Sequence, residues 1–158
     1  MNSAVTAQGS QASDAGGQRI LLIDDDLVIV KGLTFKLKSW GYQVFSVTEG
    51  SAAFNAVNEH RPHLILLDVN FRPESLHGGV DWNGFRILEW MRRGGLMASV
   101  PVIVITAGEA AEYRERALRA GAADFFTKPL DPDALHDSIR KALAAEPGRV
   151  SPRARASL

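Results

Sequence analysis

Residues 20–26 read Ile-Leu-Leu-Ile-Asp-Asp-Asp, an apolar run that ends in three acidic residues. Four consecutive apolar residues without alternation are typical of a strand that is buried on both faces. The next segment, residues 27–40, has apolar side chains at positions 27, 30, 33, 37 and 40, which is helical spacing. Gly41 then ends this helix. The opening of the domain therefore predicts a buried strand, an acidic turn and a helix.

The same alternation recurs four more times along the chain. We expect further strands at residues 42–47, 64–67, 100–105 and 122–127, and further helices at residues 51–60, 83–93, 109–120 and 131–144. Five such units predict an α/β fold: a five-stranded parallel sheet flanked by helices, doubly wound in the flavodoxin-like (βα)5 manner. In open sheets of this kind, ligands bind beyond the carboxyl ends of the strands.

The 158 residues suggest a single domain, and their composition narrows its class. The 18 basic and 18 acidic residues balance, so no net field favours nucleic acid or a membrane surface. The absence of cysteine excludes disulfides and thiolate metal sites. No signal peptide and no apolar run of membrane-spanning length is visible, which indicates a cytoplasmic protein.

We expect the domain to span residues 19–145. Residues 1–18 contain almost no bulky apolar side chain, so we expect a disordered tail there. Residues 146–158 contain two prolines and three arginines and are interpreted as a C-terminal tail. Because only this tail follows the last helix, we expect no output domain and no direct binding of nucleic acid. A domain cut from a larger protein stays open as an alternative context.

Polar residues stand at the ends of four predicted strands. They are Asp24, Asp25, Asp26, Asp68, Thr106 and Lys128. Each alone is ordinarily a cap, a turn residue or a surface charge. A parallel sheet, however, brings all of them to one edge, where clustered carboxylates raise each other's pKa unless a cation is bound. An all-oxygen site of carboxylates, waters and a phosphate suits Mg²⁺.

These residue types also fit phosphoryl transfer. A carboxylate attacks phosphorus to form an acyl phosphate. The charge that develops on the phosphoryl oxygens then needs a cation and hydrogen-bond donors. Lys128 offers a point charge, and Thr106 offers a hydroxyl group.

Four segments, in this order, resemble the motifs of response-regulator receiver domains. They are residues 20–26, residues 64–68, residues 101–107 (Pro-Val-Ile-Val-Ile-Thr-Ala) and residues 121–129 (Gly-Ala-Ala-Asp-Phe-Phe-Thr-Lys-Pro). The resemblance covers residues 18–145. It implies a phosphoacceptor signalling domain of a two-component phosphorelay, whose own chemistry is limited to self-phosphorylation from small donors and autodephosphorylation. The implied partners are a histidine kinase or phosphotransfer protein, docking near the first helix, and a separate downstream target protein.

The resemblance also implies roles by position. Asp68 is the phosphoacceptor, Asp25 the direct metal ligand and Asp24 a ligand through water. The backbone carbonyl of Asn70 completes the metal shell. The three remaining positions are the switch hydroxyl, the phosphate-pairing lysine and the switch aromatic: Thr106, Lys128 and Phe125. A plain core phenylalanine is an equal interpretation of Phe125, and Asp26 falls at a variable position and is not assigned as a ligand.

The loop after Asp68 departs from the family pattern. In the family, Pro usually follows the phosphoacceptor by four positions and Gly by eight, whereas Pro73 follows here by five and Gly84 by sixteen. The segment 69–82 therefore contains about eight extra residues, a length that is usually functional or mobile. One hypothesis is a neutral insertion, since extra loop length costs little closure entropy. The other is a loop that partly covers the site and tunes partner access or phosphoryl lifetime.

Two rival functions are compatible with some of these residues. Asp24, Asp26 and Val28 also fit the first motif of haloacid-dehalogenase-like phosphatases, with Asp24 as nucleophile and Asp26 as acid. Those enzymes need a further acidic pair after the lysine, and Asp68 would have no role. The second rival is a receiver-shaped interaction module that is never phosphorylated. Degenerate modules of that kind usually lose an acid, the threonine or the lysine, and this chain retains all of them.

Overall fold

The computed structural model describes residues 17–70, 83–94, 98–107 and 110–145. Apart from residues 17 and 18, the predicted tails lie outside these ranges. The predicted loop at 69–82 lies outside them from residue 71 onward, so the two hypotheses about that loop stay predictions.

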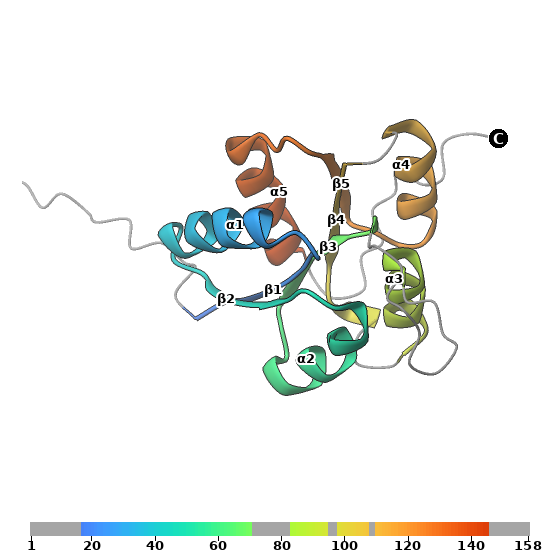
Figure 1. The fold of residues 1–158 in the computed structure, drawn as a ribbon, viewed down its shortest axis with the longest axis horizontal. Helices are drawn as coiled ribbons and strands as arrows, with labels where there is room; N and C mark the ends of the chain where they lie inside the picture. The colour runs from blue at the N-terminus through green and yellow to red at the C-terminus, as the bar shows by residue number, and fades with distance from the viewer. Residues whose placement is uncertain (1–16, 71–82, 95–97, 108–109, 146–158) are drawn as a thin grey trace, which may run out of the picture.

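Five parallel strands form one sheet in the order β2-β1-β3-β4-β5, as the sequence predicts (Figure 1). The strands are β1 (Arg19–Ile23), β2 (Gln43–Val47), β3 (Leu64–Asp68), β4 (Val102–Thr106) and β5 (Asp124–Thr127). All residues of β3 and β4 are buried, and so are the last four of β1. Their continuous apolar runs therefore belong to strands with both faces covered.

Helices cover both faces of this sheet (Figure 1). On one face lie α1 (Leu27–Ser39) and α5 (Pro132–Ala144); on the other lie α2 (Ala53–His60), preceded by the 3-10 turn η1 (Gly50–Ala52), α3 (Gly84–Arg93) and α4 (Ala110–Arg119). Alternate strand residues serve the two cores: Ile20 and Leu22 pack with α1 and α5, while Leu21 and Ile23 pack with α2 and α3. The (βα)5 fold is thus confirmed.

Element boundaries differ from the predictions by one or two residues. The strands expected to begin at residues 100 and 122 begin at Val102 and Asp124. Pro101 has no N–H to donate to a sheet. The N–H of Ala122 donates to the carbonyl of Ala117, closing the end of α4 instead of entering the sheet.

The carboxyl ends of β1 and β3 mark the point where the winding of the chain reverses. From β1 the chain crosses to β2 through α1 on one face, and from β3 it crosses to β4 through α3 on the other face. Such a reversal leaves a crevice beyond the strand ends, where ligands of this architecture bind. The fold therefore places its candidate site next to Asp24 and Asp68.

Candidate functional site

The predicted strand-end residues meet at one edge of the sheet. Asp24 follows β1, Asp68 ends β3, Thr106 ends β4, and Lys128 follows β5. Asp24, Asp68 and Thr106 are buried polar residues, at 0%, 3% and 0% exposure. Buried polar groups are costly unless they are paired, so a cluster of them indicates a built site.

Lys128 joins the two buried aspartates. Its Nζ lies 2.7 Å from Oδ2 of Asp24 and 3.1 Å from Oδ2 of Asp68. Burial alone lowers the pKa of the Lys128 ammonium, but the hydrogen bonds and charges of the two carboxylates outweigh burial and raise that pKa. The lysine therefore stays charged at neutral pH and holds a positive charge directly against Asp68.

Asp68 is held from two sides. Its Oδ1 accepts a 2.8 Å hydrogen bond from the backbone N–H of Asn70, and its Oδ2 faces Lys128. Burial raises the pKa of Asp68, the neighbouring charge of Asp24 raises it further, and the Asn70 N–H and Lys128 offset part of this rise. The ionised form of Asp68 is thus disfavoured by its surroundings. An additional cation at this edge would stabilise that ionised form.

Three carboxylates offer a compatible metal site. Asp24, Asp25 and Asp68 each place one carboxylate oxygen so that all three lie within 4.8 Å of one another. An oxygen-only donor set fits a hard cation such as Mg²⁺. Asp24 is further fixed because its Oδ1 accepts from the N–H of Asp26 at 2.9 Å. When bound, Mg²⁺ would supply positive charge opposite a transferring phosphoryl group.

Asp26 belongs to the helix and not to this cluster. Its Oδ1 accepts from the N–H groups of Val28 at 2.9 Å and Ile29 at 3.3 Å, which caps α1. An N-cap carboxylate satisfies N–H groups that have no partner within the helix. The three consecutive aspartates therefore divide into two members of the carboxylate cluster and one structural cap.

Thr106 and Phe125 occupy the positions that the resemblance assigns to the switch. Thr106 is fully buried, and its carbonyl accepts from the N–H of Lys128 at 2.9 Å. This bond ties the end of β4 to the lysine. Phe125 is buried in the core on the α2–α4 side, so in this structure its ring lies inside. A movement of Phe125 coupled to Thr106 stays a prediction.

Gly84, the first residue of α3, touches the backbone just after β3. A Cβ atom at Gly84 would lie 2.4 Å from the carbonyl oxygen of Asp68 and 2.3 Å from Cα of Val69. Neither is the flexible end of a side chain, so only glycine fits this approach. Gly84 therefore lies directly against the backbone of the candidate phosphoacceptor.

We expect Gly84→Ala to lower the free energy of unfolding by about 1–3 kcal/mol, because the methyl group overpacks a rigid backbone contact. Gly32→Ala is the matched control: nothing lies within 4 Å of a Cβ there, and alanine is the better helix former. Denaturant titrations of both variants check this, and equal stability of the two would contradict the close approach.

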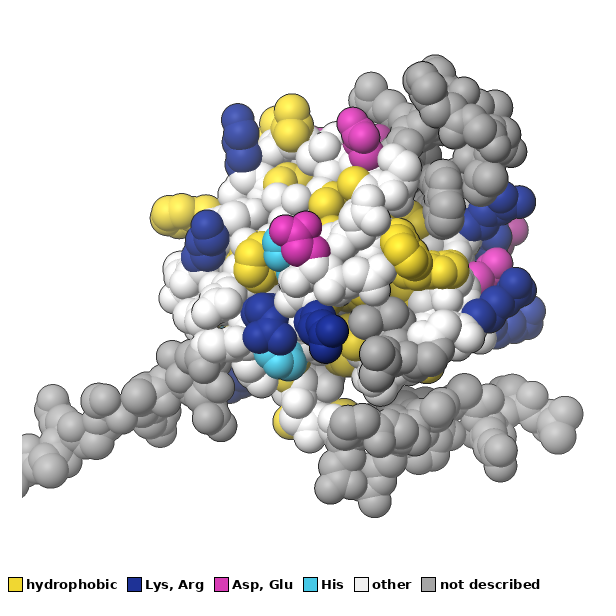
Figure 2. Space-filling model, turned by 90° about the horizontal axis from the view of Figure 1, so that it is seen from below, with side chains coloured by type: hydrophobic (Ala, Val, Ile, Leu, Met, Phe, Trp, Pro, Cys, Tyr) yellow, Lys and Arg dark blue, Asp and Glu magenta, His cyan; other side chains and the backbone are white. Residues whose placement is uncertain are grey.

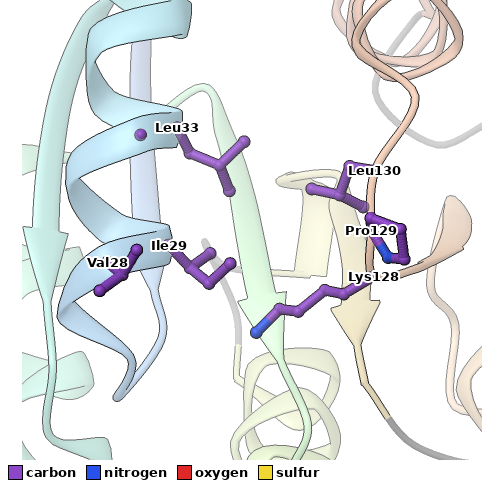
Figure 3. A pocket seen from close by; sticks show the side chains of 7 residues that line it. Val28, Ile29, Leu33, Lys128, Pro129 and Leu130 are labelled. Carbon is purple, nitrogen blue, oxygen red and sulfur yellow. The ribbon is translucent and has the colours of Figure 1, made fainter.

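A groove beside Lys128 was not predicted from the sequence. It measures about 220 Å³ and is lined by Val28, Ile29, Gly32 and Leu33 of α1 and by Lys128, Pro129 and Leu130 after β5. Figure 3 shows Ile29 and Leu33 facing Leu130 across it, with the Lys128 side chain reaching towards α1. Leu27, which periodicity assigned to the apolar face of its helix, is 60% exposed, and Val28 is 79% exposed. The sequence did contain one indication of this groove, because Leu27 and Val28 are large apolar residues directly after the helix cap Asp26.

The surface on the α2 side differs from the apolar groove because its side chains are of mixed type. Hydrophobic, basic and acidic side chains lie there in small neighbouring groups (Figure 2). Phe54 of α2 is 48% exposed, and its ring tilts onto Trp90 of α3 with 5.0 Å between centroids. Since α2 and α1 lie on opposite faces of the sheet, Phe54 serves as a reference position in the experiments below.

The histidines of the described segments pack as structural residues, in line with their lack of ligand-like spacing. The ring of His60 stacks on Phe45, and that of His136 stacks on Trp40. His63 accepts a hydrogen bond at Nδ1 from the backbone N–H of Arg19. Among the helices of the described segments, none is long and apolar enough to cross a membrane.

Comparisons with known proteins identify the family of this chain. The family model described as "Response regulator receiver domain" matches residues 20–140. The phosphate regulon transcriptional regulatory protein PhoB of Escherichia coli is 33% identical over 137 residues, covering 87% of this chain and 55% of PhoB. The chain thus spans about half the length of this curated relative.

Solved structures of receiver domains share the fold. A response regulator from Chloroflexus aurantiacus superposes with a TM-score of 0.72 at 25% identity, covering 82% of this chain and 99% of that one. The receiver domain of a sensor histidine kinase from Pseudomonas aeruginosa gives a TM-score of 0.69 at 28% identity, covering 82% and 100%, and holds a magnesium ion in its active-site cleft.

Proposed function

The chain belongs to the response regulator receiver family, and on that premise we propose that Asp68 accepts a phosphoryl group from a histidine kinase or phosphotransfer protein. One observation carries the proposal: the Lys128 ammonium bridges buried Asp24 and Asp68, so a cation stands beside the only carboxylate that ends a central strand of the described sheet. The domain that performs this reaction comprises residues 19–145.

Each residue has a definable part in the transfer. A carboxylate oxygen of Asp68 attacks the phosphorus of a phosphohistidine, an O–P bond forms, and the P–N bond breaks with its electron pair leaving on the imidazole. Lys128 pairs with a phosphoryl oxygen, and the Thr106 hydroxyl donates a hydrogen bond to another. Asp24, Asp25, Asp68 and the Asn70 carbonyl would hold Mg²⁺.

Acetyl phosphate with Mg²⁺ provides the direct test. Intact-mass spectrometry should show the protein gaining one phosphoryl group, and fragmentation should place it on Asp68. No mass gain under these conditions would contradict the proposal and favour the receiver-shaped interaction module. The phosphatase alternative is not retained, since family model and relatives agree on the receiver family and that chemistry leaves Asp68 unused.

We propose that the phosphodonor protein docks in the groove between α1 and the segment after β5. Lys128 lines this groove and also contacts Asp68, so a partner seated there would reach the phosphoacceptor. The exposed apolar side chains of Leu27 and Val28 offer surface that a partner helix would bury. The α1 helix also contains three lysines and no acidic residue, which favours an acidic partner surface.

We expect Val28→Glu to slow phosphoryl transfer from a partner kinase about tenfold or more, because it places a charge in an apolar contact and repels an acidic partner. Transfer from acetyl phosphate is the internal reference, since it needs no docking. Phe54→Glu, on the α2 side, is the matched control. An equal loss in the two variants would argue against docking at α1.

The role of the domain in signalling is inferred from the same family membership. We propose that phosphorylation changes binding to a separate downstream protein in the cytoplasm, without direct contact to nucleic acid. The balanced charge, 18 basic against 18 acidic residues, supports the last point. The transcriptional role in the name of PhoB concerns a longer protein, of which this chain matches 55%.

A further inference from the structure

The beginning of α3 forms a bridge between the candidate phosphoacceptor and helix α4. Gly84 rests against the carbonyl oxygen of Asp68 with no space for even a methyl group between them. The next residue, Phe85, is only 3% exposed. A displacement of the backbone at Asp68 must therefore move the first turn of α3, and Phe85 with it.

Phe85 in turn contacts two residues of α4. Its ring stacks on that of Tyr113, with 5.5 Å between centroids and 25° between planes. The guanidinium carbon of Arg116 lies 3.9 Å from the centroid of the same ring, which is a cation–π contact. Two residues of α4, one helical turn apart, thus hold a single side chain of α3.

Helix α4 has few other anchors. Among residues 111–119, only Ala117 is buried, and most of the others are exposed. A helix with so little buried surface is held weakly and responds to small changes in its contacts. The contacts at Phe85 therefore add to the packing of Ala117 and of α4 against β5 in fixing α4 on this domain.

We infer that Phe85 is a positioning residue that couples the backbone at Asp68 to the placement of α4, through Gly84 on one side and Tyr113 and Arg116 on the other. This inference rests on the proposed phosphorylation of Asp68. The coupling uses packing contacts, so it is separable from the covalent connection that leads from Thr106 at the end of β4 into α4.

The test compares hydrogen–deuterium exchange in α4 with and without beryllofluoride and Mg²⁺, a mimic of the phosphoryl group. In the wild type, the mimic should change exchange across residues 110–119. In Phe85→Leu and Arg116→Gln, this change should fall to less than half. Arg116→Lys, which keeps a cation over the ring, should restore it, and Phe54→Leu on α2 should leave it as in the wild type.

Binding of the mimic is measured by calorimetry in every variant. If the wild type does not bind it, the proposed function fails and the inference fails with it. If all variants bind it and α4 responds equally in wild type, Phe85→Leu and Arg116→Gln, the proposed function stands and the inference is overturned. Should Phe85→Leu fold poorly, Arg116→Gln alone decides, because Arg116 is an exposed residue.

Discussion

Asp68→Asn should abolish incorporation of phosphate from acetyl phosphate, as seen in intact mass. The amide is neither a nucleophile for phosphorus nor able to form the acyl phosphate. Asp24→Asn and Asp25→Asn should slow the reaction but leave the product, because they alter the surroundings of the nucleophile and not the nucleophile itself. An equal mass gain in wild type and Asp68→Asn would refute the assignment.

The fold of the Asp68→Asn variant is expected to be intact, and its stability provides a control. Burial raises the pKa of Asp68 in the folded state. A raised carboxyl pKa means that folding favours the protonated form, so stability contributed by this group is lost as pH rises above the pKa of the unfolded chain. At neutral pH and without metal, the neutral asparagine removes that cost. We therefore expect a thermal midpoint at least equal to that of the wild type.

The gathering of the candidate site residues at one edge was predictable because they stand at the ends of strands whose apolar runs are continuous. The register of parallel pairing then fixes which residues lie at the same edge of the sheet. Asp68 pairs with Ile105, and Thr106 pairs with Thr127. Residues 37 and 21 positions apart along the chain thus pair at the same edge as the acidic turn. Strand ends and parallel pairing can be inferred from the apolar pattern without knowledge of side-chain packing. The sequence was therefore sufficient to predict that these residues lie together.

Other features depend on packing and could not be predicted in this way. Asp24 and Asp26 have the same side chain, and the resemblance separates them only by position. The contacts that distinguish them, to Lys128 for Asp24 and to the first turn of α1 for Asp26, come from the structure. Phe85 follows a helical apolar pattern, and nothing local marks its contact with Arg116 from a different helix. The groove likewise arises where α1 and the segment after β5 meet, two regions about a hundred residues apart.

Magnesium should stabilise the wild type and be needed for phosphorylation. A hundredfold excess over its Kd should raise the free energy of unfolding by about 2.7 kcal/mol, because the folded chain alone assembles the three carboxylates. Removal of the metal with a chelator should stop transfer from acetyl phosphate, since the charge on Asp68 and on the phosphoryl oxygens would then lose the divalent cation that opposes it.

Asp25→Ala should weaken magnesium affinity by about tenfold or more, and the stabilisation by the metal should shrink with it, because an anionic oxygen is lost from the cluster. Asp26→Ala is the matched control from the same acidic triplet. It removes the cap of α1 and should cost about 1 kcal/mol of stability, yet it leaves the three clustered carboxylates in place. Calorimetric or tryptophan-fluorescence titration with Mg²⁺ measures both variants. Unaltered affinity in Asp25→Ala, or an equal loss in Asp26→Ala, would show that the metal is not held by the residues that the geometry brings together.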